Sequence, residues 1–296
     1  MLSLLADATT APIRWTDLGL RPGIDLGFFT LRYYSLAYLI GILLAYWHLG
    51  KMIRQPGAPM AQRHADDLFF WCTLGVILGG RLGYATFYTG GDTGIPSLWG
   101  RPLELLQLWQ GGMSFHGGVL GVLAAIGWVC RRNDLSFWRV CDYIAVNVPF
   151  GMFLGRLANF INGELYGRQT DVPWAMIFPD DPLQLGRHPS QLYQAGLEGA
   201  LMIAVMLWLF WRTGARYRPG LMVGVFTVGI AGARFVNEFF REPDSQLAEF
   251  TRATGLSMGQ WLSVPLILAG LAVAIYALKR PPVGTGAARG EQPAAA

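Results

Sequence analysis

Residues 138–168 read WRVCDYIAVNVPFGMFLGRLANFINGELYGR, and they carry both a fold signal and a chemical signal. Up to residue 160 the stretch is mostly apolar and long enough to cross the hydrocarbon core of a bilayer, which takes roughly 20 residues. Toward its end it carries Arg156, Asn159 and Glu164. Ionisable side chains in a membrane helix are costly, so their presence here predicts a functional site.

Apolar segments of this kind recur along the whole chain. The candidate spans are residues 31–50, 67–88, 116–131, 138–160, 190–211, 219–240 and 259–279. Only 14% of the 296 residues are charged, whereas a soluble domain has about 25%. We therefore predict an all-α, polytopic membrane helix bundle with about seven transmembrane helices in a single domain, residues 1–280. Residues 281–296, rich in Gly, Ala and Pro, are predicted to be a disordered tail.

Positive charge in the connections predicts the orientation of the bundle. Cytoplasmic loops are enriched in Lys and Arg, and alternate connections of this chain each hold three such residues. They are Lys51, Arg54, Arg63, Arg131, Arg132, Arg139, Arg212, Arg216, Arg218, Lys279, Arg280 and Arg289. The C-terminus is therefore expected inside and the N-terminus outside. The first thirty residues lack the pattern of a cleaved signal peptide, so we expect the first span to act as the targeting signal.

Several classes of protein are excluded by what the sequence lacks. The net charge is +4, but no basic stripe is present, so we expect no nucleic-acid partner. The three cysteines, Cys72, Cys130 and Cys141, have no metal-binding spacing and are expected to be small apolar core residues. No metalloprotease motif, nucleophile elbow or phosphate loop occurs. We therefore expect neither a metal ion nor a cofactor.

Polar residues gather in the outer half of the predicted spans, whereas the inner half has almost none. The set comprises Tyr34, Arg81, Tyr84, His116, Arg156, Asn159, Glu164, His188, Tyr193, Arg234, Glu238 and Arg241. Arg156, Asn159 and Gly163 share one helix face if the helix continues, and so do Arg234, Glu238 and Arg241. Each residue also has a structural alternative, such as a plain ion pair between Arg234 and Glu238. A structural role can explain the position of any one of these residues. It is a poorer explanation for the presence of the whole set in the same half of the spans.

Arginine predominates among the basic residues, since Lys51 and Lys279 are the two lysines among 23. A guanidinium binds phosphate through two parallel hydrogen bonds, so the arginines of the outer half favour a phospholipid headgroup as ligand. His116 has a side chain suited to proton transfer near neutral pH. The residues alone thus indicate a membrane enzyme acting on an anionic phospholipid. A phospholipid transporter or flippase remains the alternative, although it would need polar residues through both leaflets.

Four motifs carry a resemblance to a known family. GGMSFHGGVLG (111–121), GRLANFINGELYGR (155–168), RHPSQLYQ (187–194) and FVNEFFREPD (235–244) resemble, in this order, those of prolipoprotein diacylglyceryl transferase. The resemblance covers roughly residues 25–280. It implies a multi-pass enzyme of the bacterial inner membrane with its active site facing the periplasm. It also implies a periplasmic N-terminus and a cytoplasmic C-terminus.

The resemblance further implies the reaction and the roles of individual residues. A diacylglyceryl group would move from phosphatidylglycerol to the lipobox cysteine thiol in the signal peptide of a prolipoprotein, forming a thioether and releasing glycerol phosphate. The implied catalytic residues are His116, Tyr34, Arg234 and Glu238. The implied phosphatidylglycerol-binding residues are Arg156, Asn159, Glu164, Gly167 and Arg81. One departure is Ile230, which stands where some members of the family have a tyrosine.

Overall fold

The structure is a computed structural model, and it describes residues 12–27, 30–87, 112–242 and 254–284. The chain divides into two compact units. Unit 1 comprises Met1–His48 and Asp142–Pro282, and unit 2 comprises Leu49–Cys141 and Val283–Ala296. Each unit is described by itself. The predicted single membrane domain over residues 1–280 stays a prediction, and most of the predicted tail lies outside the described residues.

The described part of the chain is mostly helical, as predicted. The longer helices are α1 (Tyr33–Met52), α2 (Gln62–Phe87), α4 (Phe115–Arg132), α5 (Phe137–Ala145), α6 (Val148–Ile161), α7 (Ser190–Gln194), the π-helix η4 (Ala195–Leu201), α8 (Met202–Arg212), α9 (Leu221–Asn237) and α11 (Met258–Lys279). Short 3-10 helices are η1 (Trp15–Leu18) and η5 (Ala215–Tyr217). A helical segment thus lies at each predicted span.

Four helical stretches of the described residues are long and apolar enough to cross a membrane. They are Gln62–Thr86, Phe137–Ile161, Ser190–Arg212 and Met258–Lys279, and Leu221–Asn237 is a shorter apolar helix. These stretches support the predicted membrane class. The total of seven spans and the orientation of the termini stay predictions.

Two small sheets accompany the helices, and the all-α prediction did not include them. Strand β1 (Ile13–Arg14) pairs in parallel with β4 (Met176–Ile177), and β2 (Gly23–Asp25) pairs in antiparallel fashion with β3 (Thr30–Arg32). Strands of two or three residues are too short to show an alternating pattern of apolar and polar side chains. They therefore leave no signal in the sequence.

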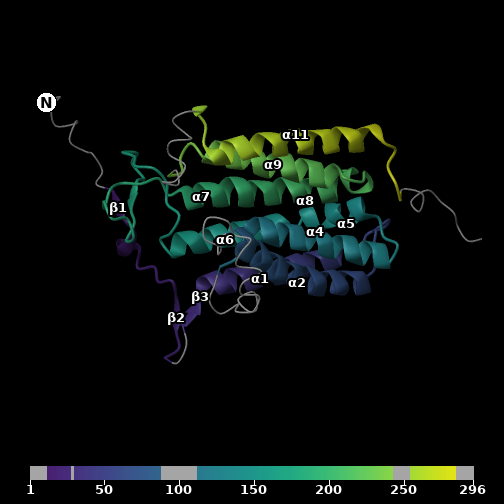
Figure 1. Cartoon of the computed structure of the whole chain (residues 1–296), viewed down its shortest axis with the longest axis horizontal. Helices are drawn as coiled ribbons and strands as arrows, with labels where there is room; N and C mark the ends of the chain where they lie inside the picture. The colour runs from purple at the N-terminus through teal and green to yellow at the C-terminus, as the bar shows by residue number, and fades with distance from the viewer. Residues whose placement is uncertain (1–11, 28–29, 88–111, 243–253, 285–296) are drawn as a thin grey trace, which may run out of the picture. The chain divides into compact units, whose positions relative to one another are not determined.

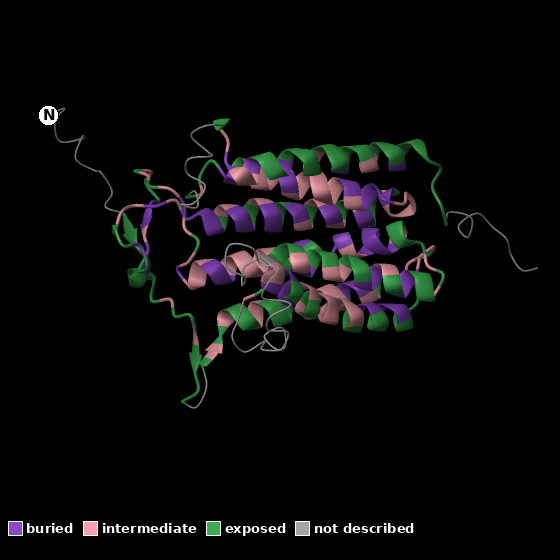
Figure 2. Cartoon of the chain, in the orientation of Figure 1, coloured by how far each residue is buried: buried purple, intermediate pink, exposed green. Residues whose placement is uncertain are grey.

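The helices of unit 1 pack in a fixed order around one continuous helical run. This run consists of α7, η4 and α8, and it contacts α6 on one side and α9 on the other, while α9 also packs against α11. Figure 2 shows the run buried along much of its length, whereas α11 presents a largely exposed face. The polar residues that α7 and η4 carry are therefore held inside unit 1.

A break divides the fourth predicted span where its sequence contains a proline. Helix α5 ends at Ala145 and α6 begins at Val148, with Pro149 in the first turn of α6. A proline is tolerated in a first turn because its missing N–H would have no partner inside the helix. Asn147 lies in the break, where its Oδ1 atom is 2.7 Å from Nδ1 of His48 at the end of α1.

Unit 2 is built on the close approach of α2 and α4. An added Cβ atom at Gly75 would lie 2.5 Å from the backbone oxygen of Gly121, and one at Gly83 would lie 2.9 Å from Cα of Gly117. Small residues allow helices to approach this closely in membranes. The glycines of α2 and α4 therefore have a packing role, because they let the two helices approach closely.

Candidate active site

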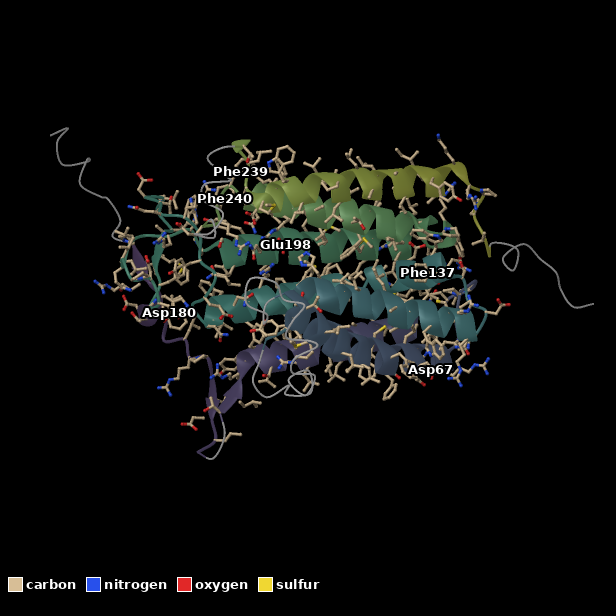
Figure 3. All side chains as sticks on the ribbon, viewed as in Figure 1. Asp67, Phe137, Asp180, Glu198, Phe239 and Phe240 are labelled. Carbon is tan, nitrogen blue, oxygen red and sulfur yellow. The ribbon has the colours of Figure 1, made fainter. Side chains whose placement is uncertain are left out.

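Arg156 and Glu198 form the central ion pair of unit 1. Nη2 of Arg156, in α6, lies 3.3 Å from Oε2 of Glu198, in the π-helix η4. The Arg156 side chain is 24% exposed, whereas that of Glu198 is only 2% exposed. Close approach of the helices makes this pair possible, because a Cβ atom at Gly199 would lie 2.7 Å from Cα of Phe153. In Figure 3, Glu198 lies on the helical run that α7, η4 and α8 form.

The end of α6 brings Asn159 and Glu164 together. Helix α6 ends at Ile161, and Gly163 adopts a φ of 72°, a left-handed conformation that commonly follows a helix end. The chain then turns back, so that Oε1 of Glu164 accepts hydrogen bonds from Nδ2 of Asn159 (2.7 Å) and of Asn162 (3.3 Å). The condition for a face shared by Arg156, Asn159 and Gly163 is not met, because α6 ends at Ile161, and only Arg156 and Asn159 lie on the helix.

Tyr34, in the first turn of α1, lies at the same end of unit 1. Its hydroxyl is 3.2 Å from that of Tyr38, one turn later. Glu164 and Arg156 are both close enough to influence the Tyr34 phenol electrostatically. Tyr34 thus lies at the same end of unit 1 as Arg156, Asn159 and Glu164, and the roles of these residues stay predictions.

Glu238 connects the end of α9 to the beginning of α11. Its Oε1 atom lies 2.6 Å from Nη2 of Arg234 and 3.3 Å from Nη1 of Arg241. Its Oε2 atom accepts a hydrogen bond of 2.9 Å from the hydroxyl of Ser257, which caps α11. Helix α9 ends at Asn237, so Arg241 reaches Glu238 from beyond the helix rather than along its face.

Arg234 interacts electrostatically both with its neighbours Glu238 and Arg241 and with the pair of Arg156 and Glu198. Three guanidinium groups, those of Arg156, Arg234 and Arg241, thus lie at this end of unit 1 together with the carboxylates of Glu164, Glu198 and Glu238. A bidentate phosphate contact is the interaction for which guanidinium groups are best suited.

Gly167 and Arg168 hold the chain segment after α9 against the segment after α6. Gly167 donates to the backbone oxygen of His188 at 2.8 Å, and Arg168 donates through Nε to the backbone oxygen of Arg241 at 2.7 Å. An added Cβ atom at Gly167 would collide with the backbone oxygen of Phe240 and lie 2.8 Å from Cβ of His188. Gly167 thus permits the close packing of the backbone near Glu238.

A small polar and aromatic layer covers this end of unit 1. Asp181 accepts two hydrogen bonds of 2.9 Å from Nε and Nη2 of Arg187, which also pairs with Glu242. The Arg187 guanidinium holds the pKa of Asp181 below its usual range, and Asp181 raises the pKa of Arg187. Trp15 packs with Met176 and Phe178, and its Nε1 donates to the backbone oxygen of Phe160 at 2.8 Å.

His188 lies at the base of this layer. Its Nδ1 atom is 3.1 Å from the hydroxyl of Tyr193, which also accepts a hydrogen bond of 2.7 Å from Nε1 of Trp174. The ring of Phe240 lies 5.2 Å from that of His188 between their centroids. Burial lowers the pKa of His188 from its ordinary value, so its neutral form is favoured.

Arg81 and His116 belong to unit 2. Arg81 is buried in α2, where Nη1 donates to the backbone oxygen of Gly112 at 3.2 Å and the guanidinium lies 5.6 Å from the centre of the Tyr84 ring. His116 is exposed in the first turn of α4, with its ring edge-on to that of Phe115. Their parts in a site shared with Arg156 stay predictions.

The described residues contain no cluster of three or more His, Cys, Asp or Glu that could hold a metal ion. Cys130 and Cys141 are buried and Cys72 is partly buried, and all three are free thiols. The ionic groups at the end of unit 1 are therefore best explained through their own charges and hydrogen bonds.

Comparison with known proteins assigns the family. The family described as prolipoprotein diacylglyceryl transferase matches residues 23–276. A relative from Erythrobacter litoralis is 69% identical over 292 residues, covering 99% of this chain and 100% of the relative. A relative from Zymomonas mobilis is 49% identical over 278 residues (90% and 94%), and one from Rhodospirillum rubrum is 47% identical over 269 residues (90% and 95%). Each is named phosphatidylglycerol–prolipoprotein diacylglyceryl transferase.

The chain belongs to this family.

The resemblance drawn from the four motifs is therefore confirmed, and the chain is a member of a transferase family. Sequence reasoning nevertheless missed buried polar residues that lie beside the predicted site residues. Glu198 is 1% exposed and pairs with Arg156, and Gln191 and Gln194 are buried on the same helical run. An ionisable residue inside a predicted span is the signal that would have found Glu198.

Proposed function

We propose that this protein transfers the diacylglyceryl group of phosphatidylglycerol to the lipobox cysteine thiol of prolipoproteins. The observation that carries the proposal is the linked set of Arg156, Glu198, Arg234 and Glu238 at one end of unit 1. The names of the relatives support a transferase, and they give no support to a phospholipid transporter or flippase. No cofactor enters the reaction.

The proposed reaction exchanges one carbon–oxygen bond for one carbon–sulfur bond. The thiolate of the peptide attacks the glyceryl carbon that carries the phosphate ester. The bond between that carbon and the ester oxygen breaks, and its electron pair leaves on glycerol phosphate. The leaving group develops negative charge, which fixed guanidinium groups stabilise in a site with little water. Arg156 and Arg234 are proposed to provide this stabilisation.

The carboxylates and neighbouring residues are proposed to fix the arginines and the lipid. Glu198 orients Arg156, and Glu238 orients Arg234, as the ion pairs of unit 1 indicate. Asn159 and Glu164 are proposed to bind the headgroup, beside the Tyr34 hydroxyl. Gly167 maintains the close packing that keeps Glu238 in place. Arg81 is also proposed to bind phosphatidylglycerol.

The thiol must lose its proton because the thiolate is the nucleophile. His116 is proposed as the general base, since an exposed imidazole can accept a proton near neutral pH. The described free cysteines of the enzyme lie on other helices and take no part. The nucleophile is therefore supplied by the substrate.

The proposed location is the bacterial inner membrane, crossed seven times, with the active site facing the periplasm. A helix at each predicted span and the basic residues of alternate connections support this topology. The N-terminus would then be periplasmic and the C-terminus cytoplasmic. Signal peptides of prolipoproteins and phosphatidylglycerol would meet the enzyme in the same leaflet.

The decisive experiment uses purified protein in detergent, phosphatidylglycerol and a lipobox peptide with one cysteine. Mass spectrometry should detect a gain of one diacylglyceryl unit on the peptide. Arg156→Ala should lower the rate by at least about 100-fold, and Arg156→Lys should recover little of it, because a point charge lacks the two-pronged geometry. Near-normal transfer by Arg156→Ala would remove Arg156 from the mechanism, and the absence of any thioether with wild-type protein would refute the proposed reaction.

A further inference from the structure

A row of buried polar side chains follows one face of α7 and η4. Gln191 is 0%, Gln194 is 2% and Glu198 is 1% exposed, whereas Leu192 and Gly196 between them are exposed. The three residues recur at intervals of three and four, which places them on one helical face. We call this row the acceptor face. It belongs to the run that packs against α6 and α9.

Each residue of the acceptor face has one oxygen without a hydrogen-bond partner among the described residues. The atoms are Oε1 of Gln191, Oε1 of Gln194 and Oε1 of Glu198, and all are shielded from solvent. The other atoms of two of these side chains are engaged. Nε2 of Gln191 donates to the backbone oxygen of Glu164 at 2.6 Å, and Oε2 of Glu198 accepts from Arg156.

Buried oxygens without a donor are costly, because they lose their hydrogen bonds to water and gain none in the folded protein. Three of them on one face indicate that a ligand supplies the missing donors. An ionised phosphate cannot do so because its oxygens are acceptors, and the Glu198 carboxylate would repel it. The ligand group must carry hydrogens on oxygen or nitrogen.

The ion pair of Arg156 with Glu198 indicates which part of a ligand meets the acceptor face. One oxygen of Glu198 is held by Arg156, and the other belongs to the acceptor face. If Arg156 binds the phosphate of a lipid, the alcohol that is esterified to this phosphate would lie next to the unpaired oxygens of the acceptor face. A headgroup that carries free hydroxyls beside its phosphate matches both requirements within a single molecule.

We propose that Gln191, Gln194 and Glu198 bind the free hydroxyl groups of the lipid headgroup and thereby select a polyol headgroup as donor. This inference rests on the proposed function, because it concerns the lipid that the site accepts. Backbone N–H groups of the peptide substrate are the other source of donors. The pairing with Arg156 favours the headgroup, because Arg156 would already hold its phosphate.

The test compares two lipid donors that differ only in the hydroxyls. Phosphatidylpropanol has the phosphate diester of phosphatidylglycerol but no free hydroxyl, so its leaving group has similar intrinsic reactivity. Wild-type protein should prefer phosphatidylglycerol by roughly 100-fold or more in kcat/KM, because the analogue leaves buried acceptors unpaired. Gln194→Met, which keeps the side-chain length, should reduce this preference at least about tenfold, mainly by slowing the reaction with phosphatidylglycerol.

Matched variants separate recognition from folding. Gln194→Asn keeps a polar side chain but withdraws its oxygen, so it should also narrow the preference if Gln194→Met does not fold. Gln184→Met is the control, because Nε2 of Gln184 donates to the backbone oxygens of Phe178, Pro179 and Asp181 in the covering layer. Its loss should affect stability while the ratio between the two donors stays unchanged.

Several outcomes would overturn the inference. An unchanged donor ratio in both folded Gln194 variants would do so, as would an equal loss with both lipids. A raised KM for the peptide with an unchanged lipid ratio would assign the acceptor face to the peptide instead. If wild-type protein forms no thioether, the proposed function fails. In that case, competition between the two lipids for binding, followed by native mass spectrometry, still tests the preference for hydroxyls.

Discussion

The two ends of unit 1 differ in how far their buried polar side chains are paired with donors and acceptors. At the end where α8 finishes and α9 begins, His48 lies between Asn147 and Trp211. The indole N–H of Trp211 can only donate, so it donates a hydrogen bond of 3.1 Å to Nε2 of His48. The proton of the neutral ring must then be on Nδ1, which donates to Oδ1 of Asn147 at 2.7 Å.

Asp142 at this end is matched in the same way. Its two carboxylate oxygens accept the backbone N–H groups of Gly220 (2.7 Å) and Val223 (2.9 Å), at the beginning of α9. The first N–H groups of a helix have no partner within it, and an acidic side chain there also suits the helix dipole. The expectation of almost no polar residues in this half of the spans is wrong, since these polar residues stabilise helix ends.

The opposite end, which carries Arg156 and Glu198, leaves several buried polar atoms without partners among the described residues. These include both side-chain atoms of Asn237 at the end of α9, besides the acceptor face. The matching at His48 and Asp142 indicates a structural role, although Nε of Arg216 at the same end also lacks a partner among the described residues. Unmatched atoms beside several arginines indicate a place where a substrate completes the hydrogen bonds. The contrast separates stability from activity, and substitutions at each end can test it.

The largest effect is expected for Glu198→Gln at the unmatched end. This change keeps an oxygen toward the acceptor face but removes the charge that orients Arg156. Transfer should fall by roughly 100-fold, in the range for loss of a positioned electrostatic group, while the unfolding temperature changes little. Rates measured alongside thermal unfolding in detergent will decide this. A large loss of stability with normal turnover per folded molecule would reverse the assignment of this end.

A smaller effect, on stability instead of activity, is expected for Asp142→Ala. Two backbone N–H groups at the start of α9 would lose their acceptor, which typically costs about 0.5–2 kcal/mol for a helix cap. Denaturation followed by circular dichroism should show the loss, and kcat/KM per folded molecule should stay the same. A drop in turnover without a drop in stability would contradict the contrast.

Trp211→Phe should have a milder effect at the same end. The change removes the indole donor to Nε2 of His48, and the loss of one such hydrogen bond typically costs about 0.5–1.5 kcal/mol of stability. His48→Phe added to Trp211→Phe should restore part of the loss, because the unmatched nitrogen is gone. Strictly additive losses in the double variant would show that the hydrogen bond contributes nothing.

The smallest effect concerns pH and the layer that covers the site. Burial holds the pKa of His188 below the value of about 6.5 that it has when unfolded. As pH falls below 6.5, the unfolded state takes up a proton first, so the folded state should lose stability. The unfolding temperature should therefore drop modestly from pH 7.5 to 5.5, and His188→Gln should weaken that drop.

Asp181 gives an internal check on this pH range. Its pKa is lowered by Arg187, so its contribution to stability is present above the unfolded value of about 3.9 and is lost only as pH falls further. Between pH 5.5 and 7.5 it stays ionised in both states. An equal acid sensitivity in wild-type protein and His188→Gln would assign the drop to another group.

Much of the fold could be predicted from the sequence, because apolar runs of spanning length are a strong and local signal. Pro149 is likewise a local signal, for the break between α5 and α6, since proline acts on its own segment. The pairing of β1 with β4 was not visible, because it joins short segments far apart in the chain. The π-helix at Ala195–Leu201 was also missed, as its residues are equally suited to an α-helix.

The site was predicted in part. Charged side chains are costly inside a membrane, and this cost drew Arg156, Arg234 and Glu238 into the prediction. In the structure these residues interact electrostatically with one another. Glu198 was missed because the predicted polar set lies near the ends of the spans, whereas Glu198 lies further along its helical run. The roles of all these residues stay proposals, as does any contribution of His116.

The π-helix η4 sets the rotational phase of the whole helical run. Below it, the buried positions continue with Met202, Met206 and Phe210, so the polar row and the apolar row lie on one continuous side. Deleting one residue within η4 would turn α7 by about 100° relative to α8. The polar row would then face away from α6 although the length and hydropathy of the span would hardly change. The number of residues in η4 thus determines which way the polar row faces, and a hydropathy profile does not detect this.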